Sequence, residues 1–325
     1  MQAILLKGYG GPEVLALGTT ADPVPGPEEI LIAVRAAGIN RADLLQREGR
    51  YPPPEPRPEQ EILGLECAGI VEAVGDRVTD FVLGQPVAAL VTGGAYAEKV
   101  AVHQRMAFAV PPNLGWPEAA AIPEAFLTAY DALTDKAQIG AGDSVLIHAA
   151  AGGVGSAAVQ LAHWMGASIV ATVGSQEKAH LVRNLGADEA VVYRDQRFAE
   201  VIAARGKGVD IILDFVGQAY WDDNISSLVP GGRLIVVGTL SGAVTDVNLG
   251  LLLQKRLTIR GTALRSRPLE DRMQLMQKFI SHALPSLADG RLKPVVDVAF
   301  EFGQVAEAHE YVARDRARGK VLLTW

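Results

Sequence analysis

The chain has 325 residues, 49% of them hydrophobic, with 34 glycines, 18 prolines and a formal net charge of −7. This length suggests about two domains, and the composition suits a globular α/β protein with many turns. The acidic balance argues against general binding to nucleic acid or to an anionic membrane surface, and no apolar run reaches the roughly 18 residues that a membrane span needs.

The first 120 residues alternate short strand-like runs with turns rich in glycine and proline, which is typical of a compact, mostly β domain. We expect strands at residues 29–37 and 69–74. The stretch at residues 51–58 is rich in proline and fits neither a helix interior nor a central strand, so we expect an extended surface loop there. The N-terminus opens directly into a strand, without the pattern of a signal peptide, which favours a cytoplasmic location.

Cys67 is the only cysteine. It therefore excludes an intrachain disulfide and a zinc site of four cysteines, and it again favours the cytoplasm. Because Cys67 lies in an apolar segment, we expect a buried, unreactive thiol rather than a nucleophile.

A strand, a glycine turn and a helix follow one another between residues 144 and 164. Residues 144–148 are apolar and of strand type, and residues 156–164 have a helical pattern. Gly153, Gly155 and Ala158 match the G-x-G-x-x-G/A spacing of dinucleotide-binding turns. Because the N-terminus of a helix presents unpaired N–H groups and partial positive charge, it attracts phosphate. We expect the backbone to contact a pyrophosphate at Gly152, Gly153, Val154 and Gly155.

The end of the next strand indicates which dinucleotide binds. An NAD site places Asp or Glu there, on the ribose 2′-hydroxyl. After the predicted strand at residues 168–173, this chain has Gly174 and Ser175, with Lys178 three residues further on. This sequence leaves room for a 2′-phosphate and supplies a hydroxyl and a positive charge, so it favours NADPH. The alternative is that Ser175 and Lys178 only begin a solvated helix, since serine is common as an N-cap.

Helices and strands alternate over the middle of the chain, which predicts a doubly wound parallel sheet. We expect the sequences at residues 186–188 and 230–232 to end helices. The predicted helices are residues 118–133, 178–185, 198–204, 220–228 and 249–254, and the further strands are residues 190–193, 209–213, 233–237 and 257–260.

The pattern changes after about residue 265. A long helix is predicted at residues 269–287, followed by a strand at 295–300, a helix at 305–313 and a last strand at 320–323.

The chain resembles the zinc-free NADPH:quinone oxidoreductases of the medium-chain dehydrogenase/reductase superfamily, of the p53-inducible quinone oxidoreductase type. The resemblance extends over nearly the whole chain, and the segments that carry it include AAGINRADLLQREGRY at 36–51, ILGLECAGIVEAVG at 62–75, AAAGGVGSAAVQLA at 149–162, LRSR at 264–267 and GKVLL at 319–323. It implies a GroES-like, mostly β catalytic domain (residues 1–120 and 266–325) and a Rossmann domain with a doubly wound parallel sheet (residues 121–265). It also implies a homodimer joined through the Rossmann sheets.

The same resemblance predicts that no zinc is bound. Zinc-dependent members have a cysteine where this chain has Asn40 and a histidine where it has Leu65, and their third ligand position falls near Glu124. Asn40 and Leu65 do not supply the thiolate and imidazole of a catalytic zinc site. Without a strong Lewis acid, the favoured substrates are those that accept hydride readily, such as quinones and conjugated carbonyls.

Two residues are the predicted catalytic groups, and both are proposed to hydrogen-bond the substrate oxygen. Asn40 replaces a metal ligand of the family and is expected to face the cleft; the alternative is a turn residue. Tyr51 carries a phenol that donates a hydrogen bond and a proton, or else packs against the proline loop. Asp43 holds the domain cleft, accepts from a cofactor hydroxyl, or is an acid in the first turn of a helix.

Further cofactor contacts, to the nicotinamide side, are predicted at the carboxyl ends of the fourth and fifth strands, where ligands bind in open α/β sheets. These are Val216, Gly217, Gly238 and Leu240. The resemblance adds Thr128, Tyr193, Leu264, Ser266 and Lys320, the last as a contact to the cofactor phosphates. One departure is Ala151, because related reductases often have serine there.

The sequence thus favours an NADPH-dependent quinone reductase. Two alternatives stay open: an NADPH-dependent reductase of 2-alkenals or enoyl thioesters, and a non-enzymatic NADPH-binding protein of the crystallin or RNA-binding kind.

Overall fold

The computed structural model describes residues 1–53 and 60–325, so most of the predicted proline-rich loop lies outside the described residues. The chain divides into two compact units. The first comprises Met1–Leu127 and Arg265–Trp325, and the second comprises Thr128–Leu264. The first boundary therefore falls at Leu127 rather than at residue 120, because the chain passes from one unit to the other within helix α3 (Pro123–Tyr130).

The second unit contains a sheet of six strands in the order β10-β9-β8-β11-β12-β13, all of them parallel. The chain runs outward from β8 to β10 and then returns to β11 beside β8, which is the doubly wound arrangement. The predicted fold class is confirmed. The strands are β8 (Ser144–Ile147), β9 (Ser168–Val173), β10 (Glu189–Val192), β11 (Val209–Asp214), β12 (Leu228–Val236) and β13 (Thr258–Gly261).

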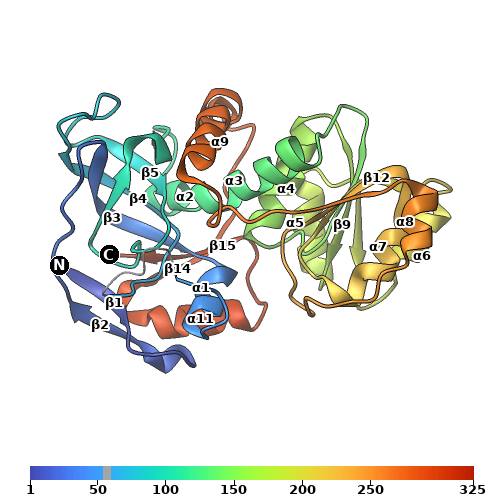
Figure 1. Ribbon diagram of the computed structural model, residues 1–325, viewed down its shortest axis with the longest axis horizontal. Helices are drawn as coiled ribbons and strands as arrows, with labels where there is room; N and C mark the ends of the chain where they lie inside the picture. The colour runs from blue at the N-terminus through green and yellow to red at the C-terminus, as the bar shows by residue number, and fades with distance from the viewer. Residues whose placement is uncertain (54–59) are drawn as a thin grey trace. The chain divides into compact units, whose positions relative to one another are not determined.

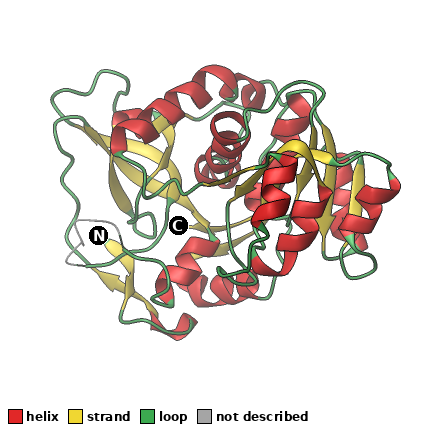
Figure 2. Cartoon of the chain, turned by 45° about the vertical axis from the view of Figure 1, so that its right-hand side comes forward, coloured by secondary structure: helices red, strands yellow, loops and turns green. Residues whose placement is uncertain are grey.

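Helices pack against this sheet (Figures 1 and 2). Apolar side chains from successive strands, among them Leu146, Val170 and Ile212, meet Phe198 and Ile225 from the helices in one buried cluster. Burial of this apolar surface is what holds the alternating elements together. The helices are α4 (Gly153–Trp164), α5 (Gln176–Asn184), α6 (Phe198–Ala204), α7 (Trp221–Ser227) and α8 (Leu249–Lys255).

The prediction that residues 230–232 end a helix is wrong. Helix α7 ends at Ser227, and the Pro-Gly-Gly sequence lies within strand β12. There the pairing with β11 shifts register, from Leu228 opposite Val209 to Arg233 opposite Ile211. Proline lacks an N–H for the ladder and Gly231 has a φ of +82°, so this sequence forms a bulge inside the strand.

The first unit is built on a mainly antiparallel sheet. Its strands follow the order β14-β15-β3-β4-β5-β7, β6 also pairs with β3, and β1 and β2 form a separate pair. The strands are β1 (Gln2–Leu6), β2 (Leu15–Thr19), β3 (Glu29–Ile39), β4 (Glu66–Val74), β5 (Pro86–Leu90), β6 (Lys99–His103), β7 (Ala107–Ala109), β14 (Val296–Glu301) and β15 (Lys320–Thr324). The helices are α1 (Arg41–Arg47), α2 (Trp116–Ala120), α9 (Leu269–His282), α10 (Leu284–Ala288) and α11 (Val305–Ala313).

Two predicted long helices are interrupted. The segment predicted at 118–133 consists of α2, α3 and a π-helical turn at Asp131–Lys136, with Pro123 beginning α3. The segment predicted at 269–287 consists of α9 and α10, and Pro285 lies in the first turn of α10. Proline is favoured at the start of a helix and disfavoured in its interior, so each break falls beside a proline.

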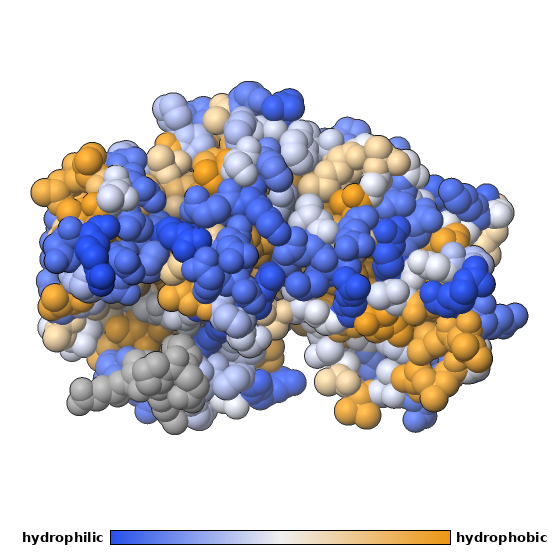
Figure 3. Space-filling model, turned by 45° about the horizontal axis from the view of Figure 1, so that its top comes forward, coloured by the Kyte–Doolittle hydropathy of each residue, from blue (hydrophilic) through white to orange (hydrophobic). Residues whose placement is uncertain are grey.

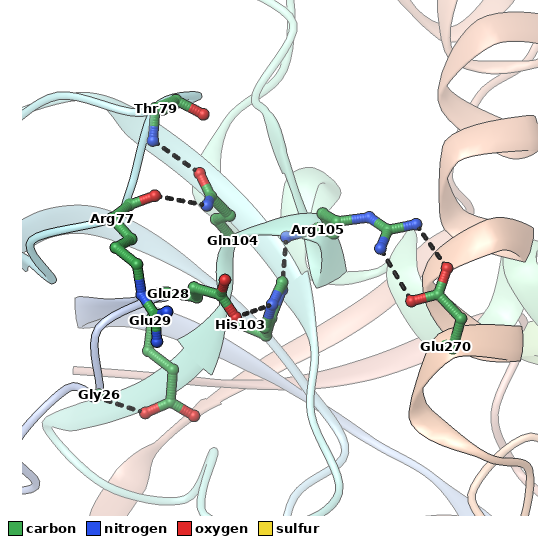
Figure 4. A network of polar contacts seen from close by, with 9 residues as sticks. All are labelled: Gly26, Glu28, Glu29, Arg77, Thr79, His103, Gln104, Arg105 and Glu270. Carbon is green, nitrogen blue, oxygen red and sulfur yellow. Dashed lines mark hydrogen bonds and ion pairs between the residues drawn. The ribbon is translucent and has the colours of Figure 1, made fainter.

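The C-terminal segment is joined to the rest of the first unit by strand pairing and by side-chain hydrogen bonds. Strand β15 pairs antiparallel with β3, with Val321 opposite Ile39. Arg105 donates two hydrogen bonds, of 2.9 and 3.0 Å, to Glu270 of α9 (Figure 4). The pairing of β15 with β3 matters for the candidate site, because it places Lys320 next to the end of β3. No helix in the described part of the chain is long and apolar enough to cross a membrane.

Candidate active site and cofactor site

The glycine turn in the second unit has the form of a phosphate site. Gly152 is the N-cap of α4, and the first helical bond runs from Ser156 N–H to Gly152 O at 2.8 Å. The N–H groups of Gly153, Val154 and Gly155 therefore have no partner inside the helix. A Cβ on Gly155 would lie 2.4 Å from the carbonyl oxygen of Ala149, so glycine is required there for the close contact between turn and helix.

The turn after β9 brings together four of the predicted cofactor residues, Gly174, Ser175, Lys178 and Tyr193. Ser175 is the N-cap of α5, and its Oγ accepts a hydrogen bond of 3.3 Å from the backbone N–H of Lys178. The capping alternative for Ser175 is therefore what the structure shows, and a capping hydroxyl still has its own hydrogen to donate. Tyr193 lies beside this turn, since its hydroxyl oxygen is 2.8 Å from where a Cβ on Gly174 would be.

The turns after β11 and β12 are bonded to each other. The carbonyl oxygen of Val216 accepts two hydrogen bonds of 2.8 Å, one from the backbone N–H of Ser241 and one from its side-chain hydroxyl. Gly217 forms an isolated β-bridge with Gly242. Gly217 has a φ of +84°, which favours glycine. Two linked turns at the carboxyl ends of β11 and β12 therefore carry the predicted contacts Val216, Gly217, Gly238 and Leu240. Thr128 and Leu264 are buried in the same unit, whereas Ser266 is exposed and belongs to the first unit.

Asn40 belongs to a buried polar cluster in the first unit. Its side chain donates to Glu66 Oε1 at 2.9 Å and accepts from Lys320 Nζ at 2.6 Å. Lys320 Nζ also lies 2.5 Å from Glu66 Oε1 and donates to Ile39 O at 2.9 Å. Glu66 is fully buried and Lys320 is 4% exposed. We name Asn40, Glu66 and Lys320 the lysine–glutamate cluster.

This arrangement gives Lys320 other partners than the predicted cofactor phosphates. An ammonium group has three hydrogens, and here each has an acceptor, on Glu66, Asn40 and Ile39. No donor is left over for a cofactor phosphate, and we assign Lys320 to the cluster instead.

The carboxylate of Asp43 stabilises the start of helix α1, next to this cluster. This carboxylate accepts hydrogen bonds from the backbone N–H of Asn40 at 2.7 Å and of Gly64 at 3.1 Å. The side chain is fully buried, so the prediction of a contact to a cofactor hydroxyl is not supported. Burial raises the pKa of Asp43 from 3.8 to about 6, although the two N–H donors and Lys320 act in the opposite direction.

We expect Asp43 to make the stability of the protein depend on pH. Because the folded-state pKa lies above the unfolded one, the folded state binds the proton more tightly, and stability falls as pH rises from about 4 to about 6. The difference in pKa corresponds to about 3 kcal/mol. Urea unfolding at several pH values measures this: the free-energy difference between wild type and Asp43→Asn should decline over that window. A difference that stays flat or rises contradicts the assignment.

Tyr51 contacts an arginine that the sequence did not single out as catalytic. The guanidinium carbon of Arg265 lies 4.9 Å from the centre of the Tyr51 ring. Arg265 donates to Gln46 at 2.6 Å, and Gln46 donates to Glu61 at 2.6 Å. Arg265 Nη2 is buried and bonds to none of the described residues. The LRSR segment was the available signal, but the sequence does not show that it lies beside Tyr51.

Burial affects the ionisation of this pair in two ways. Desolvation, with the negative charge of Glu124, raises the pKa of Tyr51, and desolvation lowers that of Arg265. Tyr51 is therefore a protonated donor at neutral pH. Cys67 is fully buried, and burial raises its pKa to about 12, so the expectation of an unreactive thiol is confirmed.

The fold and the glycine turn define a dinucleotide-binding enzyme of the α/β class, and comparisons with known proteins identify its family. Residues 26–112 match the alcohol dehydrogenase GroES-like domain, and residues 153–281 match the zinc-binding dehydrogenase domain. The chain belongs to the medium-chain dehydrogenase/reductase family, which confirms the predicted family, and it is an oxidoreductase.

Its relatives are full-length matches. It is 35% identical to a quinone oxidoreductase of Pseudomonas aeruginosa over 98% of both chains. The crystal structure of Escherichia coli quinone oxidoreductase complexed with NADPH matches with a TM-score of 0.91 at 31% identity, over the whole of both chains. A crystal structure of an NAD-dependent alcohol dehydrogenase matches with a TM-score of 0.88 at 31% identity, again over the whole of both chains.

The zinc that some members of this family bind does not fit the residues present. Leu65 is apolar and buried, and the Asn40 amide is bonded to Lys320 and Glu66. Within the described ranges there is no group of three or more His, Cys, Asp and Glu side chains suited to a metal ion. A positively charged ammonium group, 2.5 Å from Glu66, lies in the cluster instead.

Proposed function

We propose that this chain reduces quinones with NADPH, by hydride transfer from the nicotinamide and without zinc. The observation that carries the proposal is the Tyr51–Arg265 pair, in which two hydrogen-bond donors lie together and Arg265 Nη2 bonds to none of the described residues. A quinone that accepts a hydride gains negative charge on oxygen before it takes up a proton and becomes a hydroquinone. Donors aimed at that oxygen stabilise the charge.

NADPH, when bound, supplies the hydride and is left as NADP⁺. The residues of the chain bind and orient it. We assign the pyrophosphate to the first turn of α4 and the 2′-phosphate to Ser175 and Lys178. The relatives solved with NADPH support this choice of cofactor.

On the substrate side, Arg265 contributes positive charge and Tyr51 donates a hydrogen bond and then a proton. Asn40 has one Nδ2 hydrogen engaged by Glu66 and a second left for the substrate oxygen. The lysine–glutamate cluster fixes the direction of this amide, because both of its polar atoms have partners within the cluster.

Tyr51→Phe tests the proton donor. The substitution keeps the ring that contacts Arg265 and removes only the hydroxyl, so we expect kcat with 1,2-naphthoquinone to fall by about 10²-fold, with little change in the Kd of NADPH. Stopped-flow turnover and fluorescence titration measure the two quantities. Unchanged turnover removes Tyr51 from the mechanism. Tyr311→Phe, which removes a hydroxyl that donates to Asp297 in the same unit, is the matched control.

An acceptor panel separates the proposal from its alternatives. With NADPH, 1,2-naphthoquinone should be reduced faster than 2-alkenals or crotonyl-CoA. Faster reduction of the alkenes would favour the enoyl reductase alternative on the same fold. Tight NADPH binding with turnover near zero on every acceptor would favour the non-enzymatic alternative.

We also propose that two copies associate through their second units. Strand β13 is an edge strand, paired with β12 on one side and with no strand of the described chain on the other. Val244, Val247, Leu249 and Leu253, on or just before α8, are between 44% and 81% exposed. Figure 3 shows apolar side chains gathered over this end of the second unit. Open edges and apolar patches of this kind favour pairing with a second copy.

Sedimentation velocity tests the association. We expect the wild type to be a dimer, and Leu253→Glu to shift it to the monomer because the charge would be buried against the partner. Leu83→Glu, at an exposed leucine of the first unit, should leave the dimer intact. A monomeric wild type at micromolar concentration contradicts the proposal.

A further inference from the structure

A chain of buried polar side chains lies under the proposed cofactor site in the second unit. His148 follows β8 and is fully buried, and its ring contacts those of Phe198 and Tyr220 at centroid distances of 4.7 and 4.8 Å. Its Nδ1 lies 2.9 Å from the hydroxyl of Thr172, and its Nε2 lies 2.7 Å from Asn224 Oδ1. None of these groups has a role in the hydride transfer described above.

The chain continues to the turn after β11. Asn224 Nδ2 donates to Asp214 Oδ2 at 3.2 Å, and the carboxylate of Asp214 accepts from the backbone N–H of Val216 at 2.7 Å and of Gly217 at 3.1 Å. Asn224 is fully buried and Asp214 is 1% exposed. The side chains Thr172, His148, Asn224 and Asp214, which we name the histidine relay, thus end on two residues of the proposed nicotinamide side.

The direction of every hydrogen bond in the relay follows from Asp214. Burial raises the pKa of Asp214, and the backbone N–H groups of Val216 and Gly217 act in the opposite direction. In its carboxylate form Asp214 only accepts hydrogen bonds, so Asn224 presents its Nδ2 to it. Asn224 Oδ1 then faces His148 and requires a hydrogen on Nε2, which leaves Nδ1 to accept from Thr172. Burial lowers the pKa of His148 to about 4, which agrees with a neutral ring.

The other end of the relay lies at the pyrophosphate turn. The carbonyl oxygen of Thr172 accepts from the N–H of Ala150 at 3.1 Å, and His148 itself directly precedes this turn. The relay therefore connects the turn after β8, assigned to the pyrophosphate, with the turn after β11, assigned to the nicotinamide side. Buried networks in which every group is paired hold their members in one arrangement.

We propose that His148 is a positioning residue of the cofactor site, which holds the Val216–Gly217 turn in place relative to the pyrophosphate turn through Asn224 and Asp214. This inference rests on the proposed NADPH function. It predicts that the relay contributes to affinity for the complete dinucleotide and not to affinity for its adenosine half, which does not reach the turn after β11. A purely structural role would not separate these two affinities.

Calorimetric titration of Asn224→Leu with two ligands tests the proposal. NADPH contains both halves, and adenosine 2′,5′-bisphosphate contains only the adenosine half. We expect the Kd of NADPH to rise at least about tenfold and the Kd of the bisphosphate to stay within about twofold of wild type. Ile225→Ala is the matched control, because Ile225 is the next residue of α7 and lies in the core cluster without joining the relay. It should destabilise the unit and leave both affinities unchanged.

Thr172→Val is the second variant, since it keeps the shape of the side chain and should fold even if Asn224→Leu does not. It leaves His148 Nδ1 without its donor, and we expect a smaller change of the same kind, about threefold for NADPH alone. An unchanged Kd of NADPH in the variants, or an equal rise for both ligands, overturns the relay while the proposed function stands. A wild type that binds neither ligand overturns the proposed function and the relay with it.

Discussion

Ser175→Asp should reverse the preference of the enzyme for NADPH. Aspartate is as good an N-cap as serine, so helix α5 should keep its start. Its carboxylate, however, would face the 2′-phosphate of NADPH and repel it, while it would accept a hydrogen bond from the 2′-hydroxyl of NADH. We expect the ratio of kcat/KM for NADPH to that for NADH to fall about 100-fold, which corresponds to about 2.7 kcal/mol.

Two further variants make this result specific. Ser175→Asn keeps the cap without adding charge, and it should change the ratio much less than Ser175→Asp does. Lys178→Ala removes the proposed cation and should weaken NADPH about tenfold without affecting NADH. If Ser175→Asp and Ser175→Asn behave alike, or if Lys178→Ala leaves the preference unchanged, the 2′-phosphate does not bind at this turn. An NAD-dependent alcohol dehydrogenase and a quinone oxidoreductase complexed with NADPH share this fold, each at 31% identity to the chain.

Lys320→Met should lower the free energy of unfolding of the first unit by about 3–5 kcal/mol. Glu66 is fully buried, and the substitution would remove the cation that lies 2.5 Å from its carboxylate. Breaking one side of a buried ion pair leaves a desolvated charge, which is the expensive outcome. Thermal unfolding followed by circular dichroism measures the loss.

The double variant Lys320→Met/Glu66→Gln is the control for this prediction. Removing both charges should restore much of the stability, because glutamine still accepts from the backbone N–H of Glu124 as Glu66 does at 2.8 Å. If the loss in free energy of unfolding of the double variant equals the sum of the losses of the two single variants, Lys320 and Glu66 are not coupled. The description of the cluster would then be wrong.

The parts of the fold that the sequence predicted are those with local signals. The glycine turn between β8 and α4, and the alternation that follows it, depend on residues within about 20 positions of each other. The exceptions are also local but depend on context: the Pro-Gly-Gly sequence at 230–232 ends helices in many proteins, and here the pairing of β11 with β12 draws it into a strand bulge.

The candidate catalytic groups were harder to predict because they meet over long distances in the chain. Lys320 reaches Asn40 across 280 positions, through the pairing of β15 with β3, and no pattern near either residue encodes that register. For the same reason the sequence predicts a phosphate contact for Lys320 and does not predict that Arg265 lies beside Tyr51. His148 looked like the last residue of an apolar strand, and only the contacts with Thr172 and Asn224 show its place.

The initial rate of NADPH oxidation with 1,2-naphthoquinone, before and after exhaustive treatment with a zinc chelator, tests the central claim most directly. We predict rapid NADPH-dependent reduction that is the same in both preparations, because Tyr51, Arg265 and Asn40 stabilise the developing charge without a metal. A rate that falls to background after chelation and returns on addition of zinc would contradict the account, as would a chelator-treated enzyme that binds NADPH but leaves the quinone unreduced.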